Sequence, residues 1–217
     1  MPLDKKELTK ALEEMTESKK KRGFKQSVEL IVKLQNIDLK KTENRINETI
    51  ELPNGIGKPT KVCVMASGDL ALKARNAKAE MVMSREDLNR IASDKKEAQR
   101  LANEYDYFIA EAPMMPTIGK VLGQALGPKG KMPTPIPPNA PIDQIIERHR
   151  KTVRVRARDN PLIQCKVGTE SMPMDKIIEN IEAVISKLEG KLERGSKNIS
   201  KVVVKYTMSP PIKLAIK

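Results

Sequence analysis

The two ends of the chain alternate hydrophobic and polar positions in patterns typical of helices and antiparallel strands. Leu8, Leu12 and Met15 recur at near-helical spacing, which predicts a helix over residues 3–20. Apolar side chains return every three or four positions again over residues 177–192, so a longer amphipathic helix is predicted there. Period-two alternation predicts strands over residues 28–34 and 152–158. Further extended segments are predicted over residues 46–52, 162–167, 199–207 and 211–216.

Short apolar runs alternate with helical patterns in the middle of the chain. Ser84 and Asp87 resemble a capping box that opens a helix carrying Leu88, Ile91 and Leu101. Buried strands are predicted at residues 61–66, 80–83 and 105–110, and further helices around 70–72, from 117 to 127 and from 142 to 150. This order of elements is typical of a parallel sheet built from βαβ units.

The chain is therefore predicted to combine α/β and α+β character in two domains. Its ends share an antiparallel α+β pattern that the middle lacks, so residues 1–58 and 152–217 are predicted to form one discontinuous outer domain. Residues 59–151 are predicted to form a Rossmann-like βαβ domain inserted into it. Strands 152–158 and 162–167 are close enough in sequence to pair as a hairpin of the outer domain.

Composition narrows the class of protein. There are 41 Lys+Arg against 28 Asp+Glu, a formal net charge of +13, which predicts a polyanionic partner, with nucleic acid the leading candidate. No apolar run approaches the roughly 20 residues of a membrane helix, and the first residues lack the apolar stretch of a signal peptide. We therefore expect an intracellular, cytoplasmic protein without a membrane partner. Cys63 and Cys165 lie among apolar residues and are predicted to be reduced core thiols.

The charge is concentrated in the predicted outer domain. Its two segments carry 26 Lys+Arg and 17 Asp+Glu, a net +9, whereas residues 59–151 carry 15 and 11, a net +4. The outer domain should therefore provide the main polyanion-binding surface. Aromatic residues make up 2% of the chain, too few for a surface that stacks many bases, which favours a structured, phosphate-rich partner over a single strand.

Two segments of the outer domain carry candidate RNA contacts. Arg154, Arg156 and Arg158 alternate along one predicted strand, so their guanidinium groups share a face suited to phosphate; an ordinary solvated face explains them equally well. Lys201 and Lys205 share a face of another strand. The segment 206–211 ends in two prolines, and simple strand termination explains it; alternatively it offers a hydroxyl and a thioether to a ribonucleotide.

Signals for an enzyme are weak. The segment Leu126–Met132 fails the Walker pattern, because Met132 stands where Ser or Thr is required. His149 is the chain's single histidine, and neither cysteine has a neighbour that would help it bind zinc. We expect no catalytic residue, metal or cofactor. A nucleotide-dependent enzyme on the βαβ domain and a nonspecific DNA-binding protein remain the alternatives.

Several motifs together resemble the family of ribosomal protein "L one", the protein of the mobile stalk of the large ribosomal subunit, in its archaeal-type form. The resemblance is strongest over residues 118–133, IGKVLGQALGPKGKMP. Residues 23–29 (GFKQSVE), 167–170 (VGTE) and 207–210 (TMSP) agree in order and spacing. The resemblance covers nearly the whole chain and implies a split RNA-binding domain with a Rossmann-like insertion.

The resemblance also implies specific RNA-binding residues. Phe24, Ser27 and Glu29 would lie on the first strand at the RNA surface, with Glu29 accepting a hydrogen bond from a ribose or a base. Ser209 departs from the glycine common in the family. With the basic residues above, the expected RNA-binding set is Phe24, Lys25, Ser27, Glu29, Arg154, Arg156, Arg158, Lys166, Gly168, Thr169, Lys201, Lys205, Thr207, Met208 and Ser209. Secondary RNA contact or domain packing is expected for Gly127, Lys129, Gly130 and Lys131.

The implied function is that of a structural constituent of the large ribosomal subunit. Its expected partners are the stalk region of large-subunit rRNA, the exit-site tRNA whose release it would assist, and its own mRNA, whose translation it would repress. The protein is expected to be a monomer when free. In the inserted domain, Gly119, Gly123 and Gly127 recur every four residues and could form a stripe for close helix packing.

Overall fold

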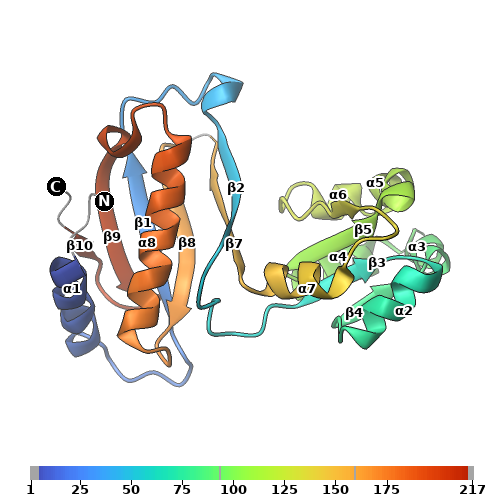
Figure 1. Cartoon of the computed structure of the whole chain (residues 1–217), viewed down its shortest axis with the longest axis horizontal. Helices are drawn as coiled ribbons and strands as arrows, with labels where there is room; N and C mark the ends of the chain where they lie inside the picture. Colours follow the sequence, from blue (N-terminus) through green and yellow to red (C-terminus); the bar gives the residue numbers. More distant parts are fainter. Residues whose placement is uncertain (1–4, 93, 159, 215–217) are drawn as a thin grey trace. The chain divides into compact units, whose positions relative to one another are not determined.

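A computed structural model describes residues 5–92, 94–158 and 160–214 (Figure 1). The chain forms two compact units. Unit 1 comprises the described residues up to Lys58 and those from Lys151 onward, and unit 2 comprises Pro59–Arg150. The return to unit 1 thus falls between Arg150 and Lys151, one residue before the junction predicted from the sequence.

Unit 1 contains a four-stranded antiparallel sheet and a separate two-stranded ribbon. The sheet has the strand order β10-β9-β1-β8, and the ribbon pairs β2 with β7 (Figure 1). The elements of unit 1 are α1 (Lys5–Glu17), β1 (Ser27–Leu34), η1 (Thr42–Asn44), β2 (Ile46–Glu51), β7 (Thr152–Ala157), β8 (Leu162–Thr169), α8 (Met174–Lys191), η3 (Gly195–Asn198), β9 (Ile199–Tyr206) and β10 (Ile212–Leu214). The ends of the first predicted helix and of the last predicted strand, at residues 3–4 and 215–216, lie outside the described residues.

The predicted hairpin between β7 and β8 is wrong. β7 pairs with β2, placing Ile46 opposite Ala157, while β8 pairs with β1, placing Val28 opposite Gly168. β2 is the last strand before unit 2 and β7 the first strand after it, so the insertion leaves and re-enters unit 1 along one ribbon. A period-two pattern identifies a strand but carries no information about its partner.

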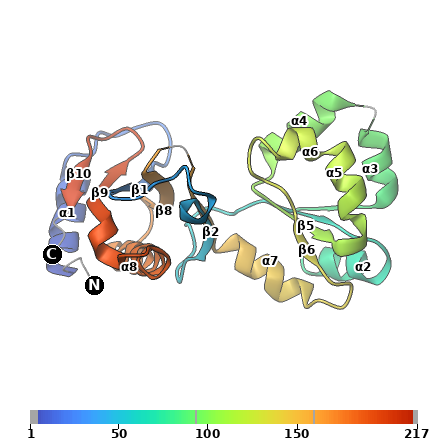
Figure 2. The ribbon, with the colours of Figure 1, turned by 90° about the horizontal axis from the view of Figure 1, so that it is seen from above.

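Both helices of unit 1 pack on one face of its sheet (Figure 2). Val28, Leu30 and Val32 alternate along β1 and are fully buried, because they join Leu12 of α1 and Ile181 of α8 in a single core. The ribbon contributes its inward residues, such as Ile50 and Val155, to the same core. Side chains of opposite parity on β1, β8 and β9 therefore point away from the helices.

Unit 2 has the predicted Rossmann-like architecture, a parallel sheet of order β4-β3-β5-β6 with helices between the strands. Its elements are β3 (Val62–Met65), α2 (Gly68–Asn76), β4 (Met81–Met83), α3 (Arg85–Ile91), α4 (Lys95–Glu104), β5 (Tyr107–Glu111), η2 (Ala112–Met114), α5 (Met115–Val121), α6 (Gly123–Leu126), β6 (Thr134–Ile136) and α7 (Ile142–Arg150). Cys63 of unit 2 and Cys165 of unit 1 are free, buried thiols, as predicted, and burial raises the pKa of each to about 12.

Two helices of unit 2 are shorter than the sequence pattern suggests. The capping box of Ser84 and Asp87 is present and opens α3. The helix predicted to continue to Leu101 is interrupted by Asp94, whose carboxylate accepts hydrogen bonds from the backbone N–H groups of Lys96 and Glu97 and starts α4 instead. The predicted helix over 117–127 is likewise divided into α5 and α6.

Residues 132–141 are rich in proline, and the sequence analysis predicts no strand there, yet this segment contains β6. β6 pairs in parallel with β5 at the edge of the sheet, where Pro135 is tolerated because one side of an edge strand needs no ladder hydrogen bonds. None of the helices in the described part of the chain has the length and apolar character that crossing a bilayer requires.

We expect unit 2 to lose stability as the pH falls below about 6.5. Burial, followed by the nearby charge of Arg148, lowers the pKa of His149, whose ring lies 5.5 Å from that of Tyr107. The unfolded chain takes up the proton at the ordinary pKa while the folded unit resists it, so stability is lost as the pH falls from about 6.5 toward the lower pKa of the folded state.

Because His149 is the only histidine, its ring-proton NMR signal reports this pKa directly. His149→Gln should weaken the dependence of the unfolding free energy on pH between about 7 and 5.5. A titration midpoint at or above the ordinary histidine value would contradict the assignment.

Candidate nucleic-acid interface

The face of the unit 1 sheet that turns away from α1 and α8 carries no covering helix within the described residues. We call this surface the open face. Its residues are Ser27, Glu29, Ile31 and Lys33 of β1, Leu162, Gln164 and Lys166 of β8, Lys201, Val203 and Lys205 of β9, and Lys213 of β10. Five lysines against one carboxylate give it a net charge of +4, which suits the phosphates of a nucleic acid.

Strand register arranges these side chains in rows across the open face. Glu29 lies opposite Lys205 on β9 and opposite Lys166 on β8, so the single carboxylate stands between two ammonium groups. Two residues along β1, Ile31 lies opposite Val203. The carboxylate oxygens of Glu29 can accept a hydrogen bond, the role that the family resemblance implies for this residue.

The start of β1 and the end of β9 are joined by paired hydrogen bonds. Thr207 N–H donates to the Ser27 carbonyl at 3.1 Å, and Ser27 N–H donates to Thr207 Oγ1 at 3.2 Å. Buried Gln26 accepts the Met208 N–H through Oε1 at 3.1 Å, and Lys205 Nζ donates to the Thr207 carbonyl at 3.1 Å. Two motifs separated by 180 residues therefore form one fixed surface.

Two large apolar side chains are exposed at this end of unit 1. Phe24 is 52% exposed and Met208 is 58% exposed, although both could in principle have packed in a core. Phe24 lies before β1, not on it as the resemblance implied, and Lys25 beside it is exposed. Exposed apolar groups beside a cationic face can contact ribose or base surfaces, which lysines alone do not recognise.

Three expected RNA-binding residues are buried. Thr169 Oγ1 lies 3.1 Å from Ser171 Oγ and 3.5 Å from the Gly57 carbonyl. A Cβ at Gly168 would lie 3.2 Å from Ile177 Cγ1, so glycine here allows α8 to approach β8. Ser209 is 8% exposed, and the serine side chain therefore adds little to the surface. These residues shape the site more than they line it.

An ion pair that the sequence analysis did not identify fixes the end of α1 to the same region. Lys19 Nζ lies 2.8 Å from Glu170 Oε2 and 5.8 Å from the centre of the Tyr206 ring. The hydrogen bond from Lys19 lowers the pKa of Glu170. Glu170 N–H donates to the Gln26 carbonyl at 3.0 Å, which joins β8 to the segment before β1.

Other site residues were also missed, and a signal existed for one of them. Lys33 shares the parity of Glu29 on β1 and could have been found from the alternation alone. Lys213 could not, because nothing in its short strand indicates the sheet to which the strand belongs. Gln26 lies within the motif of residues 23–29, but its contact with Met208 joins it to a segment near the other end of the chain, which the motif alone does not indicate.

The three predicted arginines lie outside the open face, on β7 and just beyond its end. Arg154, Arg156 and Arg158 are exposed on the ribbon, as their alternation predicted. The Arg154 guanidinium donates twice to Asn47 Oδ1 on β2, from Nε at 2.9 Å and from Nη2 at 2.8 Å. The ribbon thus forms a second basic surface of unit 1.

The glycine- and lysine-rich loop of unit 2 makes contacts that favour packing over RNA binding. Lys131 Nζ donates to the carbonyls of Ala102 and Tyr105 at 3.1 and 2.7 Å, at the C-terminal end of α4, and burial lowers its pKa. Lys129 Nζ contacts Asn103 Oδ1. Gly130 has a φ of +67°, which explains its glycine.

The prediction that Gly119, Gly123 and Gly127 form a stripe for close helix packing is wrong. A Cβ added at Gly119 or Gly123 would meet no atom within 4 Å outside the local helix backbone. At Gly127, an added Cβ would lie 2.7 Å from the Gly123 carbonyl oxygen, so this glycine serves the local turn.

The nucleotide position of a Rossmann-like sheet is filled by a side chain of unit 2. Ser67 precedes α2 after β3, and its N–H and Oγ both donate to Glu111 Oε2, at 3.1 and 2.8 Å. A phosphate would have to displace this carboxylate, and its negative charge repels anions. The geometry therefore argues against the alternative of a nucleotide-dependent enzyme.

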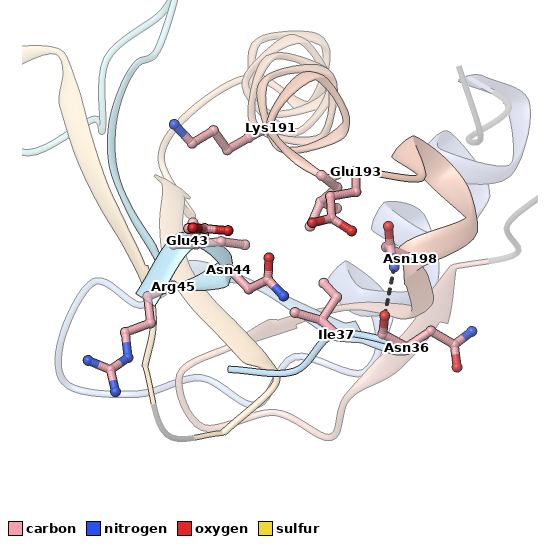
Figure 3. A pocket seen from close by; sticks show the side chains of 10 residues that line it. Asn36, Ile37, Glu43, Asn44, Arg45, Lys191, Glu193 and Asn198 are labelled. Atoms are coloured by element: carbon pink, nitrogen blue, oxygen red, sulfur yellow. Dashed lines mark hydrogen bonds between the residues drawn. The ribbon is translucent and has the colours of Figure 1, made fainter. Parts of the chain in front are cut away.

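A cavity of about 100 Å³ lies near the end of β1 that is remote from Ser27 (Figure 3). Two of its amides already have structural partners: Asn198 Nδ2 donates to the carbonyls of Gln35 and Asn36, and Asn44 Nδ2 donates to the Asp38 carbonyl. Lys191 is paired with Glu48 at 2.9 Å. Its lining is of mixed charge and selects no class of ligand.

Comparison with known proteins agrees with the sequence motifs. The model of the "Ribosomal protein L1p/L10e family" matches residues 13–210. "Large ribosomal subunit protein uL1" of Archaeoglobus fulgidus is 45% identical over 214 residues, which cover 99% of this chain and 100% of that protein. The protein of the same name from Thermofilum pendens is 47% identical over 204 residues, covering 94% and 90% of the two chains.

We expect Gln26→Leu to destabilise the surface formed by Ser27, Thr207 and Met208. Leucine fills a similar volume but leaves the Met208 N–H without its acceptor, at a cost of about 1–3 kcal/mol. Amide hydrogen exchange should accelerate at Met208, and urea unfolding should show reduced stability. Gln164→Leu, at an exposed position of the open face, is the control; equal effects of the two substitutions would contradict the role of Gln26.

Proposed function

Because the chain belongs to the ribosomal protein L1p/L10e family, we propose that unit 1 binds large-subunit rRNA through the open face and the adjoining residues Phe24 and Met208. The protein is a structural constituent of the large ribosomal subunit, located with it in the cytoplasm, and not an enzyme. Binding of rRNA is general in this family.

One observation carries the assignment of the surface. The open face combines five lysines with a single flanked carboxylate, and it ends at the exposed side chains of Phe24 and Met208, beside the hydrogen-bonded pair of Ser27 and Thr207. The lysines supply attraction that any RNA would feel. The fixed edge formed by Ser27, Thr207 and Met208 supplies shape and hydrogen-bonding groups, which select a particular RNA structure.

The finer proposal is that the rRNA target is the stalk region. We also propose that the protein assists release of deacylated tRNA from the exit site and represses translation of its own mRNA. These three roles are supported by the motifs shared with the family, over residues 23–29, 118–133, 167–170 and 207–210. Repression would follow if the mRNA presents a similar structure to the same surface.

Phe24→Ala should weaken specific rRNA binding by about 5- to 150-fold, the equivalent of 1–3 kcal/mol for an aromatic contact with a base. Affinity is measured at one salt concentration for a stalk rRNA fragment and for a random RNA duplex. Leu72→Ala is the matched control, because Leu72 is 58% exposed but lies on α2 of unit 2.

The two RNAs also separate the competing functions. Loss of preference for the stalk fragment, with duplex binding retained, is expected of Phe24→Ala. A wild-type protein that binds both RNAs equally would be a nonspecific polyanion-binding protein, and the proposal would fail. Unchanged affinity of Phe24→Ala would remove this ring from the site.

The rRNA fragment and the leader of the protein's own mRNA should compete for unit 1. Unlabelled rRNA fragment should displace labelled mRNA leader fully, and Phe24→Ala should weaken both complexes by similar factors, since one surface serves both. A ternary complex of protein, rRNA fragment and mRNA leader in a mobility-shift experiment would refute the shared surface.

A further inference from the structure

The outer side of the β2–β7 ribbon carries four arginines. We call Arg45, Arg154, Arg156 and Arg158 the arginine face. All four are exposed, and strand register places Asn47 opposite Arg156 and Thr49 opposite Arg154. Arg45 and Arg158 lie one residue beyond the paired Ile46 and Ala157. They line a shallow groove of about 350 Å³ with Lys40 and with Asp38, whose carboxylate accepts a hydrogen bond from the Lys40 N–H at 3.0 Å.

The arginine face points away from the core of unit 1. Ile46, Ile50 and Val155 occupy the inner side of the ribbon and join the core that α8 covers, so the alternate residues leave the opposite side. Arg45 is one of the residues that line the cavity of Figure 3, and the picture shows its guanidinium group pointing away from Lys191 and Glu193 on the other side of that cavity. The lysines of the open face also point away from α8, and β7 lies beside β8.

Several of these guanidinium groups have N–H donors that could bind a ligand. Among the described residues, no side-chain hydrogen bond or ion pair is formed by Arg156 or Arg158. Arg45 donates from Nε to the Leu39 carbonyl at 3.2 Å, which orients its side chain at the rim of the groove. Arg154 is oriented in the same way by its bonds to Asn47.

The chemistry of the ribbon matches a phosphate backbone. Arginines two residues apart on a strand stand about 6.6 Å apart, and each presents a planar fork that binds phosphate oxygens in pairs. The strands of the ribbon, INETIE and TVRVRA, contain no aromatic residue on which an unpaired base could stack. A helical RNA, which exposes its phosphates and hides its bases, fits these properties better than a single strand.

We infer that the arginine face is a second RNA-binding surface, which grips the phosphate backbone of an RNA helix independently of its sequence. The inference rests on the proposed function, because it adds a second RNA contact on β7, the strand beside β8 of the open face. The open face and its apolar edge select the RNA, and the ribbon adds affinity and salt dependence.

The test compares salt dependence in two triple variants of the full chain. Arg45→Gln, Arg156→Gln and Arg158→Gln together remove three charges and leave the Arg154–Asn47 contact intact. The control removes the same charge from exposed helix positions of unit 1 through Lys10→Gln, Lys176→Gln and Lys187→Gln. Thermal unfolding of both variants checks that the fold is retained.

Affinities for the stalk rRNA fragment and for a random RNA duplex are measured over a range of salt concentrations. In the arginine variant, the slope of log K against log salt should become shallower by about 2, since each lost phosphate contact removes roughly 0.7–0.9. The preference for the stalk fragment should stay within about threefold of the wild type, and the lysine control should change neither quantity appreciably.

Failure of this inference is distinguishable from failure of the proposed function. Suppose that the wild type prefers the stalk fragment, but the arginine-to-glutamine variant and the lysine control both keep the wild-type salt slope. The arginine face then does not bind RNA, and a partner such as an acidic protein is indicated. If the wild type shows no preference, the proposed function fails, while the slope on random duplex still tests the arginine face. The variant Arg45→Lys, Arg156→Lys and Arg158→Lys should retain the wild-type slope with weaker binding, because lysine keeps the charge but loses the fork.

Discussion

The one-sided covering of the unit 1 sheet is the constraint on which the rest of this unit depends. A strand turns alternate side chains to opposite faces, so a sheet with helices on one face must give its other face to solvent or to a partner. Val28, Leu30 and Val32 provide the buried apolar contacts on the covered face. The alternate residues on the other face are not constrained by the core and can serve binding. Across the open face as a whole, five lysines and a single glutamate occupy such outward positions.

Attraction and selection are carried by different groups on that surface. Charge acts over roughly a Debye length and cannot distinguish one RNA from another. Selection requires atoms held in place, and here they are held by the backbone bonds between Ser27 and Thr207 and by buried Gln26. The buried glycine Gly168 contributes indirectly, because a Cβ there would crowd the Ile177 side chain of α8, 3.2 Å away, against the strand that supports this edge.

Local patterns predicted the elements well because both periodicities are local properties. The strand alternation of β1, the amphipathic helix α8 and the capping box at Ser84 depend on near neighbours alone, and all three are present. The strand partners were harder, since β7 and β8 alternate identically but bind different strands. Asp94 was missed for a related reason: its capping bonds compete with a helix that the apolar spacing alone would continue.

In the candidate site, too, local motifs were predictable from the sequence and contacts between distant segments were not. Motifs shared with the family predicted Ser27, Thr207 and Met208, but only the folded chain shows that Gln26 holds Met208 and that Thr169 is buried beneath the surface. The arginines illustrate the limit most clearly. Their alternation predicts that they share one face of a strand, but it does not predict that this strand pairs with β2, outside the sheet. The β2–β7 ribbon is the part of unit 1 that leads into and out of unit 2. At that end of the ribbon, Leu52 N–H donates to the Lys151 carbonyl at 2.9 Å. The same pair of strands therefore closes unit 1 around the insertion and carries a basic surface. Any substitution that separates β2 from β7 should disturb both.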